Sequence, residues 1–273
     1  MQRVLTFVVP LRSPAASRNW ERVLERLAET VRSIQSACDK TPGLGAVLVA
    51  NDDAQLPELP GCFEVVRVDL PPPEVSVFKG EGSDEARRNA VWWDKGFKVA
   101  TGMRHAHLAG SRFVMSVDAD DFISQNIGEL PAREPESDGW LVNEGWLLPA
   151  GARWGIALDD FHNWCGTYAI VRTDLLPLEA PVETLAPEII KRLFGHHREL
   201  VPDLASKGKV LKPAGYLAAV YTVAHSESNF GRGSLLSSVL SPSKFFANPR
   251  KYVKRLLRLR YFARRDRAEF SVL

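Results

Sequence analysis

A short apolar run that ends in a dense group of carboxylates is the feature that most limits how this chain can fold. Residues 113–117 lead directly into Asp118, Ala119, Asp120 and Asp121. A buried strand of this kind would carry its acidic end to the carboxyl edge of an open α/β sheet, where ligands bind. Carboxylates at this density repel one another unless a cation lies among them. The stretch therefore predicts a site for Mg²⁺ or Mn²⁺, with an acidic turn that caps the next helix as the alternative.

The length and composition are those of an ordinary soluble globular protein. The 273 residues, 45% hydrophobic and 25% charged, are enough for one sizeable core and exclude disordered and fibrous classes. Cys38, Cys62 and Cys165 are far apart in the sequence and lack CxxC spacing, so the sequence indicates neither a zinc site nor a disulfide framework, and a reducing cytoplasm fits best. The apolar run at 4–11 is too short to span a bilayer and predicts a buried strand.

Apolar runs and helical periodicities alternate along the first half of the chain. Apolar runs predict strands at 4–9, 46–50, 63–70 and 112–117, and helical patterns predict a helix capped by Asn19 and another over about 83–102. This order is typical of a mostly parallel sheet flanked by helices, an α/β fold.

Polar residues follow these elements in a consistent order. The segments are Phe-Val-Val-Pro at 7–10, Val-Ala-Asn-Asp-Asp at 49–53, Asp-Glu-Ala-Arg-Arg-Asn at 84–89, Ala-Thr-Gly at 100–102 and Asp-Ala-Asp-Asp at 118–121. In that order they resemble the GT-A glycosyltransferases, most closely the broad family 2 group of nucleotide-sugar transferases. The resemblance implies a Rossmann-like GT-A domain over 1–233, with a nucleotide-sugar-binding half at 1–121 and an acceptor half at 122–233.

The resemblance also implies how the nucleotide would be held. Main-chain groups around Pro10 and Leu11 would bind the nucleobase, together with the carboxylate of Asp52 or Asp53. A carboxylate accepts hydrogen bonds from a ring N–H, and a strand end offers backbone donors and acceptors.

Further positions acquire roles at the diphosphate and the metal. Arg12 and Arg88 would lie near the diphosphate, since arginine makes bidentate contacts to phosphate oxygens. By the resemblance, Asp118 would contact the ribose or the metal, and Asp120 would bind the metal that bridges both phosphates. His225, which follows a predicted strand, would complete the metal site. The metal would neutralise the charge on the departing nucleoside diphosphate.

An aromatic and polar segment follows in the acceptor half. Four of the seven tryptophans lie between residues 140 and 164. Aromatic faces beside hydrogen-bonding groups suit a sugar, which favours Asn143, Trp146, Asp160 and Trp164 as acceptor-binding residues. The alternative is that at least two of these tryptophans belong to the core.

The base that deprotonates the acceptor hydroxyl is less clearly marked. Related enzymes commonly supply it from a Glu-Asp pair after a glycine-containing turn, and residues 194–199 read Phe-Gly-His-His-Arg-Glu at the comparable place. The pair is absent, which leaves His197 or Glu199 as the catalytic base of an inverting transfer.

The C-terminal segment is strongly basic. Ten Lys or Arg residues stand against Asp266 alone between 244 and 267, in a chain whose net charge is +2. Val253, Leu256, Leu257 and Tyr261 recur at helical spacing, so residues 234–273 are expected to form a linker and a basic amphipathic helical tail on an anionic membrane surface. The chain lacks a recognised nucleic-acid module, and we expect no nucleic-acid partner.

Together these patterns predict an enzyme at the cytoplasmic face of the membrane. It would be a metal-dependent glycosyltransferase, of hexosyltransferase type, that moves a sugar from a nucleoside-diphosphate sugar to a hydroxyl of a glycan or glycolipid. One alternative is a catalytically silent nucleotide- or sugar-binding relative. A sugar nucleotidyltransferase ranks lower, because residues 11–14 (Leu-Arg-Ser-Pro) are not the glycine-rich loop that such enzymes use.

Overall fold

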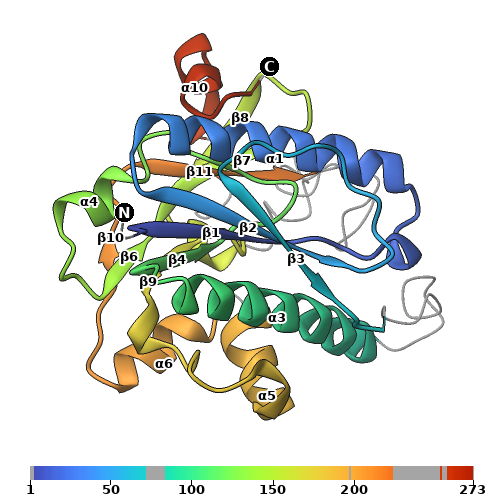
Figure 1. Ribbon diagram of the computed structural model, residues 1–273. Coiled ribbons are helices and arrows are strands. Elements are labelled where there is room, and N and C mark those ends of the chain that lie inside the picture. The colour runs from blue at the N-terminus through green and yellow to red at the C-terminus, as the bar shows by residue number, and fades with distance from the viewer. Residues whose placement is uncertain (1–2, 72–83, 197, 224–252, 254–256, 273) are drawn as a thin grey trace.

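A mostly parallel sheet forms the centre of the molecule. The computed structural model describes residues 3–71, 84–196, 198–223, 253 and 257–272, and every structural statement below concerns these residues. Within them, the larger sheet has the strand order β10-β6-β9-β4-β1-β2-β3 (Figure 1). Its strands are β1 (Leu5–Pro10), β2 (Leu44–Asn51), β3 (Phe63–Val68), β4 (Phe113–Ser116), β6 (Gly139–Leu141), β9 (Ala169–Arg172) and β10 (Lys212–Pro213). Strands β4, β1, β2 and β3 are parallel and β9 is antiparallel to its neighbours, which confirms the predicted fold class.

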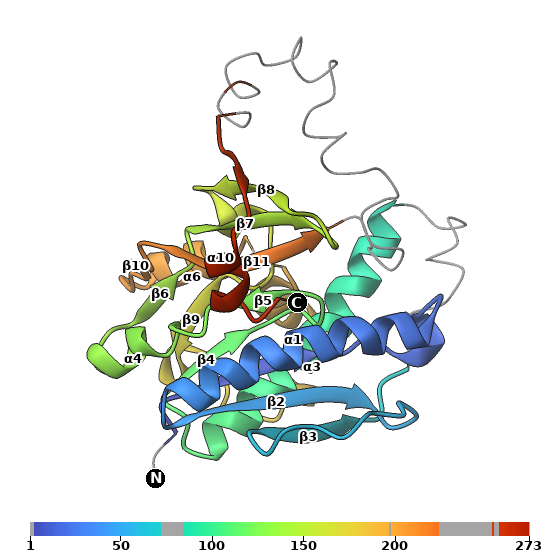
Figure 2. The same cartoon turned by 90° about the horizontal axis from the view of Figure 1, so that it is seen from above.

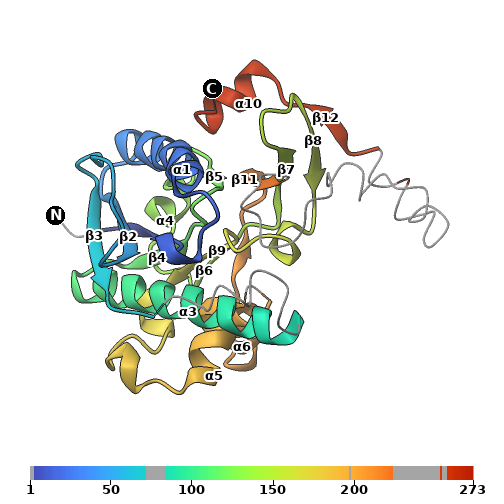
Figure 3. The same cartoon turned by 90° about the vertical axis from the view of Figure 1, so that its right-hand side faces the viewer.

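Helix α1 (Trp20–Lys40) covers one face of this sheet (Figures 1 and 3). Asn19 caps it as expected, since its side chain accepts a hydrogen bond from the N–H of Arg22 at 3.0 Å. Val23, Leu27 and Ile34 recur at helical spacing and are buried in the core against the sheet.

Helix α3 (Asp84–Leu108) covers the opposite face and is longer than the sequence predicts. The expectation that it ends near Gly102 is wrong. A Cβ at Gly102 would lie 2.5 Å from Val8 Cγ1 and 2.8 Å from Val49 Cγ2, so this glycine lets the helix pack closely on β1 and β2. The helix ends instead before Gly110, whose φ of 81° lies in the left-handed region.

A second sheet packs beside the first and has the described order β12-β8-β7-β11-β5. Its strands are β5 (Phe122–Ile123), β7 (Glu144–Pro149), β8 (Trp154–Leu158), β11 (Leu217–Val223) and β12 (Leu259–Tyr261). The remaining short helices are α4 (Glu129–Arg133), α5 (Pro187–Ile189), α6 (Leu200–Ser206) and α10 (Arg264–Glu269), with a π-helical turn, η5 (Ile190–Gly195), and 3-10 turns at Pro14–Ala16, Phe161–Asn163, Thr173–Leu175 and Val182–Thr184.

The end of the chain belongs to the folded body. Strand β12 pairs with β8, so Tyr261 lies opposite Trp154 in a sheet, and the expectation of a helical stripe that reaches Tyr261 is wrong. Phe262 and Phe270 are 1% and 2% exposed and join a core cluster with Trp146. Burial of these two rings explains why residues 257–272 dock on the body, with α10 beside α1 (Figure 2). Residues 234–252 and 254–256, which hold the rest of the predicted tail, lie outside the described residues.

None of the described helices combines the length and the apolar character needed to cross a bilayer.

Candidate functional site

The acidic turn after β4 is held in place by its own last carboxylate. Asp121 is fully buried, and its Oδ2 accepts hydrogen bonds from Thr167 Oγ1 at 2.7 Å and Cys165 Sγ at 2.9 Å. Its Oδ1 accepts from the N–H of Thr222 at 3.3 Å. The N–H of Asp118 in turn donates to Thr167 Oγ1 at 2.9 Å. Asp121 therefore anchors the turn to the segments around β9 and β11, and leaves Asp118 and the next carboxylate at the sheet edge.

Burial raises the pKa of Asp121 well above its ordinary value, and the charges of Asp120 and Asp118 raise it further. The cluster divides into one buried member, Asp121, with a structural role and two carboxylates, Asp118 and Asp120, that are partly exposed at the sheet edge.

Lys95 of α3 is a site residue that the sequence analysis did not identify. Its Nζ lies 2.5 Å from Asp118 Oδ1. Burial lowers the pKa of Lys95, but the Asp118 carboxylate more than offsets this and the pKa is raised, so the ammonium stays charged. A Cβ at Gly166 would lie 2.4 Å from Lys95 Nζ and 2.7 Å from Asp118 Oδ2, so a larger residue there would require this pair to shift. The available signal was spacing, since Lys95 follows Arg88 by two helical turns and lies on the same side of α3.

A second charged pair on α3, Lys98 with Asp94, lies near Arg12 and Asp53 at the ends of β1 and β2. Lys98 is fully buried and its Nζ lies 2.8 Å and 3.0 Å from the two carboxylate oxygens of Asp94. Burial lowers the pKa of Lys98, and the Asp94 carboxylate opposes that effect. The charges of Arg12 and Asp53 also act on this pKa to a smaller extent, so both residues lie near Lys98. Helix α3 therefore connects the ends of β1, β2 and β4.

The end of β1 offers fewer backbone groups than expected. Pro10 has no N–H, and the N–H of Leu11 already donates to the carbonyl of Val49 at 2.9 Å. The Leu11 side chain is fully buried. The expectation of free main-chain donors at Pro10 and Leu11 is therefore wrong, and only carbonyl oxygens can serve a ligand there.

The loop after β2 presents two carboxylates to solvent. Asp52 and Asp53 are exposed, and the loop is held from below by Arg67, whose Nη1 donates to the carbonyls of Asn51 at 2.8 Å and Ala54 at 2.7 Å. Because β1 and β2 are adjacent and parallel, this loop and the end of β1 lie at the same edge. Arg88 is exposed on α3, and no hydrogen bond joins its side chain to the other candidates in the described part of the chain.

The segment with the candidate base Glu199 follows η5, which packs against α3. A Cβ at Gly195 would lie 2.1 Å from the carbonyl oxygen of Trp92, so the two segments touch through their backbones. The ring of Trp92 meets His196 edge-on at 4.6 Å. Glu199 is exposed just before α6, close enough for its charge to add to the effect of burial in raising the pKa of Tyr168. Its rival His197, like the proposed metal ligand His225, lies outside the described residues.

Three of the four proposed acceptor residues occupy one neighbourhood around the turn at Phe161–Asn163. Trp164 Nε1 donates to Asp160 Oδ1 at 3.2 Å, and the carbonyl of Asn143 accepts from the N–H of Phe161 at 3.0 Å. Arg198 Nη2 donates to the carbonyl of Asn163 at 2.9 Å. This last bond ties the acceptor neighbourhood to the segment that carries the candidate base.

Trp146 belongs to the core and not to the acceptor neighbourhood. It is 3% exposed and its ring meets Phe262 edge-on at 5.2 Å, so neither face is open to a sugar. Trp140 is also buried, against Phe113 at 5.3 Å. The alternative that two of the four tryptophans are packing residues is the correct one.

The residues present suit a divalent metal that arrives with its substrate. No group of three or more His, Cys, Asp or Glu side chains that could hold a metal ion occurs among the described residues. Asp118 and Asp120 nevertheless supply two hard oxygen ligands at one turn, and Mg²⁺ is commonly bound by one or two carboxylates plus substrate phosphates. The ion would have to displace Lys95 from Asp118.

Comparison with known proteins gives only distant structural likenesses. No protein-family model and no curated protein matches the chain. TarS from S. aureus (residues 1–349) is similar with a TM-score of 0.41 and 15% identity over 81% of this chain, which spans 60% of that structure's length. A putative nucleotide-diphospho-sugar transferase from Desulfovibrio desulfuricans G20 gives 0.38 and 12%, covering 93% of this chain and 98% of the other. The bifunctional IspDF from Campylobacter jejuni gives 0.35 and 13%, covering 82% and 50%. Likenesses at this level do not assign a function.

Proposed function

We propose that this protein is a metal-dependent glycosyltransferase that binds a nucleoside-diphosphate sugar at the carboxyl edge of the larger sheet. The observation that carries the proposal is that two acidic segments, after β2 and after β4, lie at the same edge of the sheet on either side of β1, with Lys95 of α3 paired to Asp118. Such a donor requires carboxylates that bind its nucleobase and its metal ion. It also requires cationic side chains that bind its diphosphate.

Asp118 and Asp120 would hold the divalent metal, Mn²⁺ or Mg²⁺, with His225 as a further ligand. When bound, the ion would supply Lewis-acid neutralisation of the charge on the departing nucleoside diphosphate. Lys95 supports the same assignment, because it already places a positive charge at Asp118 and would be free to contact a phosphate once the carboxylate binds the ion.

The rest of the donor would lie along the ends of β1 and β2. Asp52 or Asp53 would accept a hydrogen bond from the nucleobase, and the carbonyl oxygens of Pro10 and Leu11 would accept others. Arg12 and Arg88 would contact phosphate oxygens; for Arg12, proximity to the Lys98 neighbourhood supports this.

Transfer would occur by a single displacement with inversion, to a hydroxyl of a glycan or glycolipid. The acceptor oxygen bonds to the anomeric carbon as the bond to the diphosphate breaks, and a base takes the hydroxyl proton. Glu199 or His197 would be that base. Asn143, Asp160 and Trp164 would hold the acceptor, and their link to the base through Arg198 supports this arrangement.

A nucleotide-sugar-binding protein without turnover is the second candidate. It is favoured by the ion pair of Lys95 and Asp118, which already neutralises the carboxylate that a metal would use. Both candidates bind the donor, so only turnover separates them.

We further propose that the basic segment between residues 244 and 258 attaches the protein to an anionic membrane surface at the cytoplasmic face. The charge of the segment supports this, since each basic residue near such a surface contributes on the order of 1 kcal/mol.

The test is a thermal-shift screen of nucleoside-diphosphate sugars on the full chain, with Mn²⁺ and with a chelator. A ligand that binds the native state raises the unfolding temperature by mass action. We expect one donor class to raise it only when Mn²⁺ is present, and Asp120→Asn to remove that rise. If no donor shifts the protein with or without metal, the proposal fails; a shift without hydrolysis or transfer selects the binding protein.

A further inference from the structure

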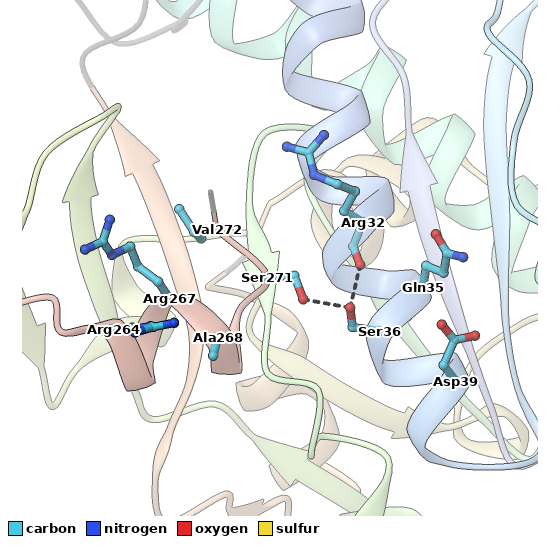
Figure 4. A pocket seen from close by; sticks show the side chains of 9 residues that line it. All are labelled: Arg32, Gln35, Ser36, Asp39, Arg264, Arg267, Ala268, Ser271 and Val272. Carbon is cyan, nitrogen blue, oxygen red and sulfur yellow. Dashed lines mark hydrogen bonds between the residues drawn. The ribbon is translucent and has the colours of Figure 1, made fainter.

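A pocket lies between α1 and the docked C-terminal helix, away from the proposed donor site. Its volume is about 650 Å³, and it is lined by Arg32, Gln35, Ser36 and Asp39 of α1 on one side (Figure 4). Arg264, Arg267, Ala268, Ser271 and Val272 form the other side. The pocket exists only because the end of the chain folds back onto α1.

Its charges are unbalanced. Three arginines and one carboxylate, Asp39, line it, and none of these arginines forms an ion pair within the described residues. The Nε atoms of Arg32 and Arg267 are buried and have no hydrogen-bond partner. Arg26, also on α1, has an unpartnered Nε as well, but its Nη1 lies 2.6 Å from a Glu29 oxygen, so its charge is paired. Buried donors without acceptors are uncommon in native proteins, and here two of them border one pocket.

The helix that carries Arg264 and Arg267 is held in position by contacts at the pocket wall and beyond it. Ser36 Oγ and Ser271 Oγ lie 2.6 Å apart and join the two sides (Figure 4). The carboxylate of Glu269 accepts from Asn126 Nδ2 at 2.6 Å, and its carbonyl accepts from the N–H of Gln125 at 3.1 Å. Phe270 is buried. Because α10 is already held against the body, little conformational entropy of its backbone is lost when an anion binds.

The helix ends in a motif that sets this geometry. The N–H of Val272 donates to the carbonyl of Arg267 at 2.9 Å, and the N–H of Ser271 donates to Ala268 at 3.3 Å, the two bonds of a Schellman motif. Ser271 has a φ of 54°, in a position where glycine is usual. Its hydrogen bond to Ser36 explains why a serine occupies it.

We propose that this pocket binds the phosphate groups of a small phosphorylated ligand. Guanidinium groups bind phosphate oxygens in a bidentate manner. Three guanidinium groups match a ligand with several negative charges, such as a phosphate, better than a ligand with one carboxylate. The volume has room for a phosphorylated compound larger than phosphate itself.

The site is separate from the proposed donor site and does not depend on it. Helix α1 starts after the carboxyl end of β1 and ends at Lys40, just before the amino end of β2 at Leu44. Arg32 and Asp39 therefore lie toward the amino edge of the sheet, whereas the donor residues lie at the carboxyl edge.

The proposal is tested by titrating the full chain with inorganic pyrophosphate in the presence of EDTA, by calorimetry and thermal shift. We expect binding that weakens about tenfold in Arg32→Gln and in Arg267→Gln, since a hydrogen bond to a charged group is worth roughly one such factor. Arg265→Gln is the matched control, because this arginine is on the same helix and does not line the pocket. Because Arg32 and Arg267 lie away from the donor residues, loss of binding in these two variants separates this site from the donor site.

Two further variants avoid the buried atoms. Arg264 is exposed and Gln35 lies at the surface of α1, so Arg264→Gln and Gln35→Glu should weaken binding without loss of folding. A second arm of the experiment measures binding to phosphatidylglycerol vesicles, with phosphatidylcholine vesicles as the comparison. If Arg264→Gln weakens binding to phosphatidylglycerol and pyrophosphate does not bind, the phosphate that the pocket binds belongs to a lipid. Equal binding by the parent, Arg264→Gln and Gln35→Glu, or no binding of either phosphate source, overturns the proposal.

Discussion

Lys95 Nζ lies 2.5 Å from Asp118 Oδ1, so the acidic turn after β4 already carries a protein cation. The partners come from different elements, α3 and the end of β4, and Gly166 approaches them so closely that a larger residue would require the pair to shift. This pair places a lysine in direct competition with a divalent metal for the same carboxylate.

Replacing Lys95 by Met should therefore raise the affinity of the donor-free protein for Mn²⁺, by about tenfold, because it removes the positive charge that pairs with the proposed ligand Asp118. The same change should weaken nucleoside-diphosphate binding in a chelator, where Lys95 is the cation closest to Asp118. Mn²⁺ titration followed by electron paramagnetic resonance measures the first effect. Unchanged Mn²⁺ affinity would show that the lysine and the metal do not share Asp118.

Asp120→Asn should abolish the dependence of donor binding on Mn²⁺ and leave the unfolding temperature of the ligand-free protein near that of the parent. The fold is anchored by the buried Asp121 and not by Asp120. Calorimetric titration of the donor with and without Mn²⁺ measures the effect. Parental affinity for donor in Mn²⁺ would remove Asp120 from the metal site.

One of two separate variants, Glu199→Gln or His197→Asn, should lower turnover by roughly two to four orders of magnitude while donor binding is retained. A base acts on the acceptor proton only, so the effect belongs in turnover and not in donor affinity. Initial rates at saturating donor separate the two. If both variants turn over at the parental rate, the base lies elsewhere, with Asp159 and Asp160 the next residues to replace.

Ending the chain just before Lys244 should unfold the second sheet, because strand β12 and the two core phenylalanines lie in the deleted segment. Loss of Phe262 and Phe270, both buried, costs about 3–5 kcal/mol for each ring. A sharper test of membrane attachment replaces Arg250, Lys251, Lys254 and Arg255 by Gln. This variant should keep the parental unfolding temperature and release from anionic vesicles at lower salt. If this variant co-sediments with anionic vesicles as the parent does, the basic segment is not what attaches the protein to the membrane.

Cys62 should react with iodoacetamide at lower pH and faster than Cys38 or Cys165. A side-chain hydrogen bond between Cys38 and Cys62 lowers the pKa of Cys62 and raises that of Cys38, and burial raises the pKa of Cys38 further. Burial raises the pKa of Cys165. Since the thiolate is the reactive form, the rate at Cys62 should rise with pH and level off below the usual thiol range. Peptide mapping over a pH series measures the rate at each cysteine. Replacing Cys38 by Ser should slow alkylation of Cys62 if the serine hydroxyl is a weaker hydrogen-bond donor to Cys62 than the thiol is.

Much of the architecture follows from local pattern alone. The strands at β1, β2, β3 and β4, the cap at Asn19 and the acidic turn at 118–121 are all confirmed near their expected places. Each depends on residues within one element, whose periodicity and end signals are written in consecutive positions. The choice of the carboxyl edge follows in the same way, because parallel neighbours end at a common edge.

The pairings between elements were decided only by the tertiary structure. The contact of Lys95 with Asp118, the thiol pair of Cys38 and Cys62, and the bond between Ser36 and Ser271 join residues that no local pattern associates. Each depends on the twist of the sheet, on the register at which a helix crosses it, and on glycines that let backbones approach. The C-terminal segment shows the same limit. Its basic residues resemble a free amphipathic helix in sequence, but two phenylalanines bury against Trp146 and turn part of it into a strand and a docked helix. Hydrophobic burial is not directional, so the sequence shows that these rings will be covered, and only the assembled fold determines by what.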